Sequence, residues 1–360
     1  MVHRAKGANP SNGPPAAATH RRCFGGATRG LRGRGEPGKD RAVRSLTRYV
    51  LAGALRRLLA LAGLAAALGA LAGLVEAGNR PAGAPEAEWL GALSRVPEVV
   101  FFAAPLLCLL GVLWTVRDLV PPGVAEGLGG AGVPAGRIDR AVWGAVAVAL
   151  AATIGLGGWL APWAQRELAT RREEAWARSG GAPDWTPGNG VWVRAEKRWL
   201  RVEASGGEVR AVRGVEFGSA GPRLLRGEEI AAAALPSAEA LALLATPPAF
   251  QTVPELLAAG AVRSRHGHPP APVRSELALR GAIAALLVPA GATGLACRRM
   301  RRPARRWAFA AALAGAGMLG AQAAHVFATR GELGAGWVAA LPPALAGGVA
   351  VLAWVFRGRS

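Results

Sequence analysis

The sequence alternates between six long apolar stretches and polar connections rich in glycine, proline and arginine. Each stretch lacks Asp, Glu, Lys and Arg and approaches the roughly 20 helical residues that cross a hydrocarbon core about 30 Å thick. They cover residues 58–75, 99–116, 141–161, 281–297, 307–328 and 339–356. This pattern predicts six transmembrane helices.

The connection between the third and fourth stretches, residues 164–275, is too long for a loop and predicts an inserted domain outside the cytoplasm. Residues 192–204 end in an alternation that puts Leu200 and Val202 on one apolar face. After a Gly-Gly turn the alternation resumes over 209–217, which is typical of β-structure with one buried face.

Helical signals close the inserted domain. Residues 252–255 form a capping box before a short helix that we expect to end at Gly260. The prolines within 269–272 predict an extended approach to the fourth span. Glu276 and Arg280 are four residues apart, so they are expected to pair on the first turn of that span.

These elements define a fold class and four divisions of the chain. We expect a polytopic α-helical membrane protein with six transmembrane helices and an inserted, extracytoplasmic β-domain. The divisions are a disordered basic extension (1–45), spans one to three (46–163, with a cytoplasmic segment at 120–139), the β-domain (164–275) and spans four to six (276–360). A true start near Val43 is an alternative for the first division.

Arginine and lysine are distributed unevenly between the two sides of this layout. Residues 1–57 hold 13 basic residues against two acidic ones, and residues 298–306 hold six arginines. On the opposite side, residues 76–98 carry two arginines and four glutamates. Positive residues favour the cytoplasmic side, so both termini are expected in the cytoplasm of a multi-pass protein.

The net charge of +20 has two interpretations, nucleic-acid binding or membrane topology. With 51% apolar residues and only 6% aromatic ones, no base-stacking surface interleaves with the arginines. We therefore interpret the arginines as topology determinants and contacts to anionic lipid, with no nucleic-acid partner.

Motifs for catalysis and cofactors are weak. Residues 33–40 approximate a phosphate-binding loop, but Asp40 replaces the required hydroxyl residue. The serine-protease-like sequence 218–221 lies in the β-domain, away from any membrane histidine. The three cysteines cannot form a zinc cage. We expect no enzyme activity and no cofactor.

Histidines leave two alternatives open. His266 and His268 form either a metal pair without a third ligand or part of a solvated linker, which the sequence favours. His325, one turn after Gln322 in the fifth span, marks either a functional site or a helix–helix hydrogen bond.

Several local sequences, in this order and spacing, resemble the LptF/LptG permease family, the membrane half of the lipopolysaccharide-exporting ABC transporter. The resemblance covers about residues 46–358. It rests on Leu46-Thr-Arg48-Tyr49, Pro105-Leu-Leu, Ala125-Glu126-Gly-Leu with Ala131-Gly132-Val133 and Arg137-Ile138, Pro254-Glu255-Leu256-Leu257, Glu276 with Arg280, and Leu341-Pro342-Pro343.

The resemblance implies a function, a location and partners. The chain is expected in the bacterial inner membrane, where it extracts lipopolysaccharide and passes it to periplasmic jellyroll bridge proteins through its own jellyroll-like domain. A sister permease of the same type and a cytoplasmic ATPase dimer are the implied partners. Glu126, Gly132 and Arg137 correspond to the ATPase-coupling segment, and Leu200 and Val202 are the candidates for the lipid path.

The coupling segment departs from the family pattern. It contains Gly127, Gly129, Gly130 and Gly132, and Pro134 stands where the family usually has serine. Each interior glycine costs a helix about 1 kcal/mol relative to alanine. The alternative function is a membrane-anchored periplasmic scaffold or sensor without transport activity.

Overall fold

The computed structural model describes residues 37–78, 85–130, 133–178, 190–195, 198–205, 208–218, 221–225, 235–298, 300 and 303–356. Val43–Ser360 form one compact unit, separate from Met1–Ala42. The elements are α1 (Pro37–Gly78), α2 (Pro85–Leu119), α3 (Pro122–Gly130), α4 (Ala135–Gly155), the π-helical turn η1 (Leu156–Leu160), α5 (Ala161–Arg178), β1 (Val191–Ala195), β2 (Arg198–Ser205), β3 (Glu208–Gly218), β4 (Gly221–Leu224), α7 (Ala238–Ala245), the 3₁₀ turn η3 (Pro248–Phe250), α8 (Val253–Arg265), α9 (Ala271–Ala285), α10 (Leu287–Cys297), α11 (Pro303–Ala314), the π-helical turn η4 (Gly315–Leu319), α12 (Gly320–Thr329) and α13 (Ala335–Phe356).

Six helical segments are long and apolar enough to cross a membrane. They are Arg44–Val75, Leu93–Leu119, Gly136–Arg171, Ala271–Cys297, Arg305–Thr329 and Ala335–Phe356. Each contains one of the predicted stretches and extends beyond it at one or both ends. The chain is therefore mostly helical, with the composition of a multi-pass membrane protein.

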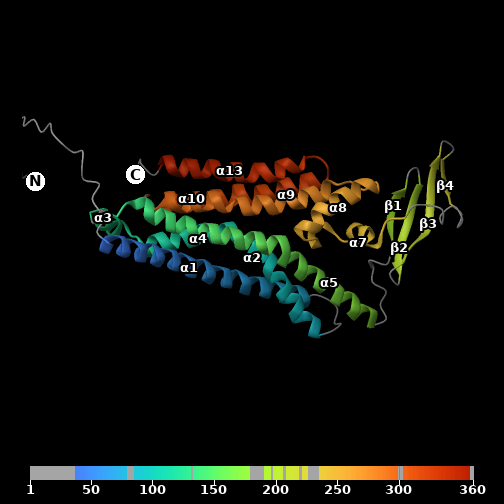
Figure 1. The fold of residues 1–360 in the computed structure, drawn as a ribbon, viewed down its shortest axis with the longest axis horizontal. Helices are drawn as coiled ribbons and strands as arrows, with labels where there is room; N and C mark the ends of the chain where they lie inside the picture. The colour runs from blue at the N-terminus through green and yellow to red at the C-terminus, as the bar shows by residue number, and fades with distance from the viewer. Residues whose placement is uncertain are drawn as a thin grey trace, which may run out of the picture. The chain divides into compact units, whose positions relative to one another are not determined.

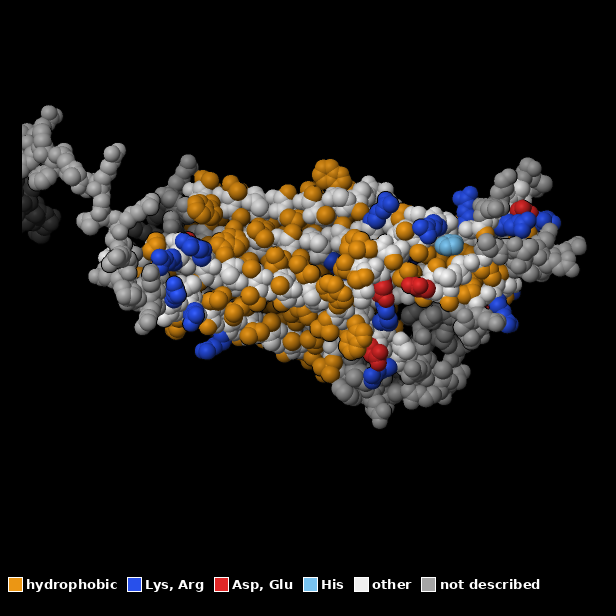
Figure 2. All heavy atoms as spheres, viewed as in Figure 1, with side chains coloured by type: hydrophobic (Ala, Val, Ile, Leu, Met, Phe, Trp, Pro, Cys, Tyr) orange, Lys and Arg blue, Asp and Glu red, His pale blue; other side chains and the backbone are white. Residues whose placement is uncertain are grey.

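The long helices lie side by side, with hydrophobic side chains covering much of their outer surface (Figures 1 and 2). The fourth segment is central, since 67% of its apolar window is buried against 17% for the first. Two close contacts between helices depend on a glycine. An added Cβ at Gly157 would lie 2.2 Å from the Phe101 ring, and one at Gly294 would lie 2.7 Å from Val112.

Segments far apart in sequence meet at one end of the bundle. The main hydrophobic core joins Val50 of α1, Val120 after α2, Ile138 of α4 and Ala346 of α13. Figure 1 shows α3 and the end of α13 at this same end. We call it the arginine end, because Arg44, Arg48, Arg137, Arg140 and Arg298 all belong to it.

The strands form one antiparallel sheet with the order β1-β2-β3-β4. A register shift between Arg201 and Val202 interrupts the pairing of β2 with β3. Leu200 lies opposite Gly214, where an added Cβ would come within 3.0 Å of it and 2.7 Å of Leu225. A glycine is therefore needed at position 214 for the sheet to close over its core.

The segment 164–275 contains helices as well as strands. The described residues place α5, α7 and α8 in it beside the single four-stranded sheet. The predicted run 192–204 is two strands, β1 and β2. The capping-box helix is confirmed as α8, but it continues past Gly260 to Arg265.

The approach to the fourth span differs from the expected extended chain. It is helical from Ala271, because a proline in the first turn lacks only an N–H that would be unpaired anyway. In the sixth segment, Pro342 and Pro343 lie inside α13.

Candidate functional site

The predicted coupling segment, 120–139, contains the short helix α3 and the start of α4. Val133 N donates to Leu128 O at 2.8 Å, which connects residue 133 back to α3. Glu126 belongs to α3, but its side chain lies outside the described residues, as does all of Gly132. Val120 and Ile138, at the two ends of the segment, are buried in the main core. The segment is thus anchored to the bundle, and its contact with an ATPase stays a prediction.

Arg137 lines a pocket of about 280 Å³ together with Arg44, Thr47, Arg48 and Arg140. The pocket lies between the start of α1 and the start of α4. Of these four arginines, the sequence predicted a site role for Arg137 alone, since nothing in the local pattern shows that α1 and α4 meet here. The structure therefore adds three arginines to the one that the resemblance implied.

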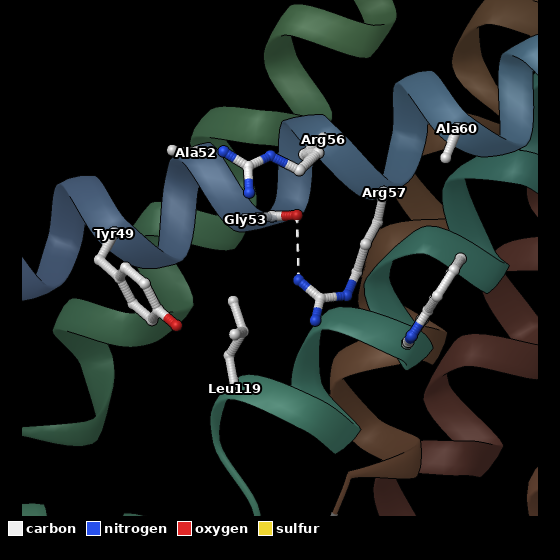
Figure 3. Close-up of a pocket in the computed structure, with 8 residues that line it drawn as sticks. Tyr49, Ala52, Gly53, Arg56, Arg57, Ala60 and Leu119 are labelled. Atoms are coloured by element: carbon white, nitrogen blue, oxygen red, sulfur yellow. Dashed lines mark hydrogen bonds between the residues drawn. The ribbon is translucent and has the colours of Figure 1, made fainter.

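A second pocket, of about 380 Å³, lies where α1 passes the end of α2 (Figure 3). Arg57 is fixed there by Gly53 O and by Asp118 Oδ2, each 3.2 Å from a guanidinium nitrogen. Its guanidinium carbon lies 5.7 Å from the centre of the Trp114 ring. Tyr49 and Arg56 also line this pocket, so it combines aromatic and cationic side chains.

A third pocket, of about 140 Å³, is almost wholly apolar. It lies between α1 on one side and α2, α4 and α10 on the other, and residues such as Leu55, Leu107 and Leu287 line it. The Thr153 hydroxyl donates to Ala149 O of its own helix at 2.8 Å, so it is already satisfied. A space of this kind suits hydrocarbon rather than a polar ligand.

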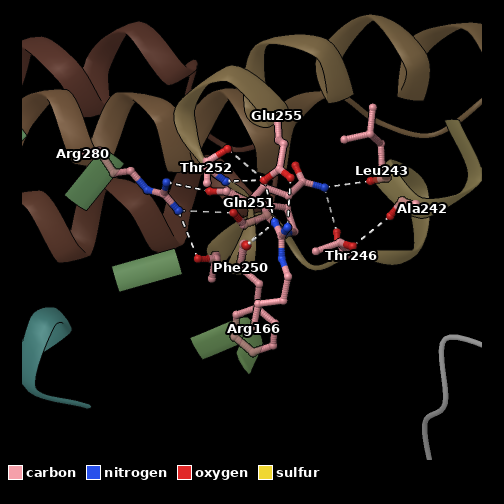
Figure 4. Close-up of polar contacts among 11 residues, drawn as sticks. Arg166, Ala242, Leu243, Thr246, Phe250, Gln251, Thr252, Glu255 and Arg280 are labelled. Carbon is pink, nitrogen blue, oxygen red and sulfur yellow. Dashed lines mark hydrogen bonds and ion pairs between the residues drawn. The ribbon is translucent and has the colours of Figure 1, made fainter. Parts of the chain in front are cut away.

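A polar cluster joins the long apolar helices to the inserted segment, and we call it the junction: Arg166, Gln251, Thr252, Glu255 and Arg280 (Figure 4). Arg166 of α5 donates to Glu255 of α8 and, at 2.9 Å, to Phe250 O. The fully buried Gln251 amide donates to Leu243 O and Thr246 O at the end of α7. The turn between α7 and α8 is thereby held from several sides.

Arg280 of α9 completes the junction from the fourth span. Its guanidinium donates to Gln251 O at 2.7 Å and Ala249 O at 3.0 Å. The predicted pair with Glu276 is confirmed, at 3.0 Å between Nε and Oε1, with exposed fractions of only 7% and 15%. Span four is therefore tied directly to the main chain of the inserted segment.

His325 makes a helix–helix contact. Its Nδ1 lies 2.8 Å from Ser275 Oγ, and its Nε2 lies 3.8 Å from Glu276 Oε2. The interpretation as a hydrogen bond between spans four and five is confirmed. Gln322, by contrast, is exposed.

Leu200 and Val202 have exposed fractions of zero. They pack in one cluster with Val193 and with Leu241 and Leu244 of α7. The apolar face of the sheet is thus filled by the segment's own side chains. Access of lipid to this face stays a prediction, and it requires α7 to move away from the sheet.

His266 and His268 belong to the contact between α8 and the sheet. Arg194 N donates to His266 O at 2.9 Å. The Trp199 and His268 rings meet edge to face at 6.4 Å between centroids, and burial lowers the pKa of His268. Among the described residues, no group of three or more His, Cys, Asp or Glu side chains could hold a metal ion.

The sequence identified part of the junction. Glu255 was recognisable from the capping box and the Glu276–Arg280 pair from its spacing. Arg166 and Gln251 carried no local signal, because their partners lie on other elements. Only the meeting of α5, α8 and α9 gives these side chains their role.

Fold and site together define a class: a mostly helical protein with six helices of membrane-spanning length and a small antiparallel sheet. No protein-family model and no curated protein sequence matches the chain. A particular function is therefore argued from the geometry.

Proposed function

We propose that this chain is one permease subunit of an ABC transporter that extracts lipopolysaccharide from the bacterial inner membrane. Its partners in this proposal are a sister permease, a cytoplasmic ATPase dimer and periplasmic jellyroll bridge proteins. Both termini are cytoplasmic, and the inserted segment is a jellyroll-like periplasmic domain. The observation that carries the proposal is the junction, which ties the inserted segment to spans three and four through Arg166 and Arg280.

The junction supports transport because it couples two parts that an exporter must move together. Arg280 contacts main-chain oxygens of the inserted segment, so a shift of span four displaces that segment as well. An exporter needs different affinities for lipid in two states, set by a partner that hydrolyses ATP. The apolar pocket beside α1 offers room for part of an acyl chain.

Affinity purification of the detergent-solubilised chain from its native host tests the proposal. Mass spectrometry should identify a second six-span permease and an ATPase in the purified complex. Recovery of the chain without any ATPase would contradict the proposal. Identification of the sister subunit would also decide whether this chain is of the F or the G type.

Charge reversal in the coupling segment is a second test. Glu126→Lys should uncouple ATP hydrolysis from export while the complex stays assembled, because a charge at an interface rim affects docking rather than folding. Glu332→Lys, at an exposed position near the other end of the bundle, is the matched control. Unchanged export in Glu126→Lys would defeat the coupling assignment.

A scaffold or sensor anchored in the membrane is the second candidate, favoured by the closed core around Leu200 and Val202. A photo-crosslinking residue at either position should capture lipopolysaccharide during ATP-driven turnover if the sheet opens. The same residue at exposed Val212 controls for nonspecific capture. Crosslinks that stay within the protein at both buried positions would favour the scaffold.

A further inference from the structure

The starts of α1 and α4 are held together by apolar packing. Val50 of α1 shares the main core with Ile138 and Ala141 of α4, and Leu51 packs against it. An added Cβ at Gly144 would lie 3.5 Å from Leu51, an ordinary contact distance. The residues one or two turns earlier on both helices must therefore face each other as well.

Those earlier turns carry four arginines. Arg44 and Arg48 are four residues apart on α1, and Arg137 and Arg140 are three apart on α4, so each pair shares one helix face. All four line the same pocket of about 280 Å³, with Thr47 between the α1 pair. Like charges at these spacings repel one another.

Among the side chains that the structure describes, which do not include Asp40 one turn before Arg44, no carboxylate lines this pocket. Asp139 is the nearest acidic residue in sequence, and it faces Arg298 instead, at 3.6 Å. Arg140 Nε donates to Gly136 O of its own helix at 3.3 Å, which leaves its other nitrogens for a ligand. The first turn of α4 contains no acidic residue, and its N-terminal dipole adds further positive potential.

We propose that this arginine pocket binds a phosphate group that links α1 to α4. Guanidinium groups donate paired hydrogen bonds to phosphate oxygens, and several of them around one anion offset their mutual repulsion. The phosphate can come from an anionic phospholipid head group or from a free phosphate ion. Tyr49, 63% exposed, follows Arg48 in sequence, and the exposed apolar residues Leu59 and Leu64 lie farther along α1, where acyl chains would pack.

Lipid binding to the purified full-length chain tests this proposal without any partner protein. Native mass spectrometry would follow retention of phosphatidylglycerol against phosphatidylcholine. In a second arm, inorganic phosphate would be titrated while thermal unfolding is recorded. The variants are Arg48→Gln, Arg137→Gln and their combination, and Arg117→Gln, exposed at the end of α2, is the matched control.

Each pocket arginine replaced should weaken anionic binding by about fivefold, which corresponds to the roughly 1 kcal/mol that a basic residue contributes near an anionic membrane. Selective retention of phosphatidylglycerol, lost in the pocket variants and kept in Arg117→Gln, supports a lipid head group. Stabilisation by inorganic phosphate with the same dependence on the variants, and no preference between lipids, supports a free ion.

Two outcomes would overturn the proposal. One is the absence of any anion preference in the unaltered chain. The other is an equal loss in Arg117→Gln, which would mean that general surface charge attracts the anion. Arg48→Lys and Arg137→Lys, which keep the charge but lose the paired donors, control for loss of folding: they should bind the anion more tightly than the Gln variants and less tightly than the unaltered chain. Because the chain is measured alone, failure to export lipopolysaccharide would leave this result untouched.

Discussion

Arg166 and Glu255 are 89 positions apart in sequence and form a two-point ion pair between α5 and α8. Nη1 lies 3.0 Å from Oε1 and Nη2 lies 2.5 Å from Oε2. Thr252 donates to the same Oε2 from its backbone nitrogen, at 2.7 Å, and from its hydroxyl, at 2.9 Å. One carboxylate thus caps α8 and fastens it to the third span.

This pair predicts a loss of stability in acid. Arg166 and the hydrogen bonds from Thr252 hold the pKa of Glu255 at about 2, against an ordinary value of 4.5. The carboxylate therefore contributes fully above pH 4.5, and its contribution is lost as the pH falls toward about 2. Thermal unfolding in detergent should show this decline in the unaltered chain.

Substitutions at Glu255 separate the charge from the cap. Glu255→Gln keeps an acceptor for the Thr252 nitrogen but cannot ionise. It should abolish the acid-dependent part of the stability and lower the free energy of unfolding by roughly 1 kcal/mol at neutral pH. Glu255→Ala should cost more because the cap is lost too. Glu239→Gln, exposed in the first turn of α7, should change neither quantity. An unchanged acid profile in Glu255→Gln would contradict the role of the pair.

Arg280 should be among the least replaceable residues of the fourth span. Both Arg280→Ala and Arg280→Lys are expected to destabilise the chain by roughly 3 kcal/mol, because Glu276 would remain buried without the guanidinium group that pairs with it. Hydrogen exchange should accelerate in the turn at Pro248–Phe250, because Pro248 O and Ala249 O would lose their guanidinium donor.

Arg274 provides the control for that experiment. It lies on α9, one to two turns before Arg280, and is exposed. Arg274→Ala should stay within about 0.5 kcal/mol of the unaltered chain. Equal effects at both positions would mean that Arg280 acts only through net charge.

Two glycines near η1 should respond in opposite directions. Gly157→Ala places a methyl group against Phe101 and should cost about 1–3 kcal/mol, which Phe101→Leu should partly restore. Gly155→Ala meets nothing within 4 Å and should be neutral or stabilise by up to about 1 kcal/mol. Unfolding in detergent measures both, and a tolerated Gly157→Ala would contradict the close packing of α2 against η1.

The core of the sheet should be sensitive to truncation on one face only. Leu200→Ala is expected to cost about 2–5 kcal/mol, because it leaves a cavity against α7 and Gly214. Val212→Ala, about half exposed, should cost far less. Similar losses at the two positions would mean that Leu200 is not enclosed as described.

Much of the helical architecture could be predicted because the length of a charge-free apolar stretch is a local property. All six segments were found this way, and so was the Glu276–Arg280 pair, whose spacing alone brings the side chains together. The division of 192–204 into two strands was missed, since no glycine or proline marks residues 196–197.

Contacts between elements that are far apart in sequence could not be predicted from the sequence. Arg166 looks like any arginine at the polar end of an apolar helix, and Arg44 looks like a topology signal. Their roles depend on how α5 meets α8 and how α1 meets α4. Hydrophobic periodicity indicates which face of a helix is buried, but not which neighbour covers it.

The π-helical turn η1 sets the rotational phase of everything that follows it in the third span. Ala161 N donates to Leu156 O, five residues earlier, so this turn holds one residue more than an α-helix needs. Winding the same residues as a regular α-helix, without the extra residue being absorbed in the π-turn, would rotate α5 by about 100°. Arg166 would then point away from Glu255, although neither residue had changed. A single extra residue within the third long helical segment thus sets the direction of a side chain beyond it, so that this side chain meets its partner on α8.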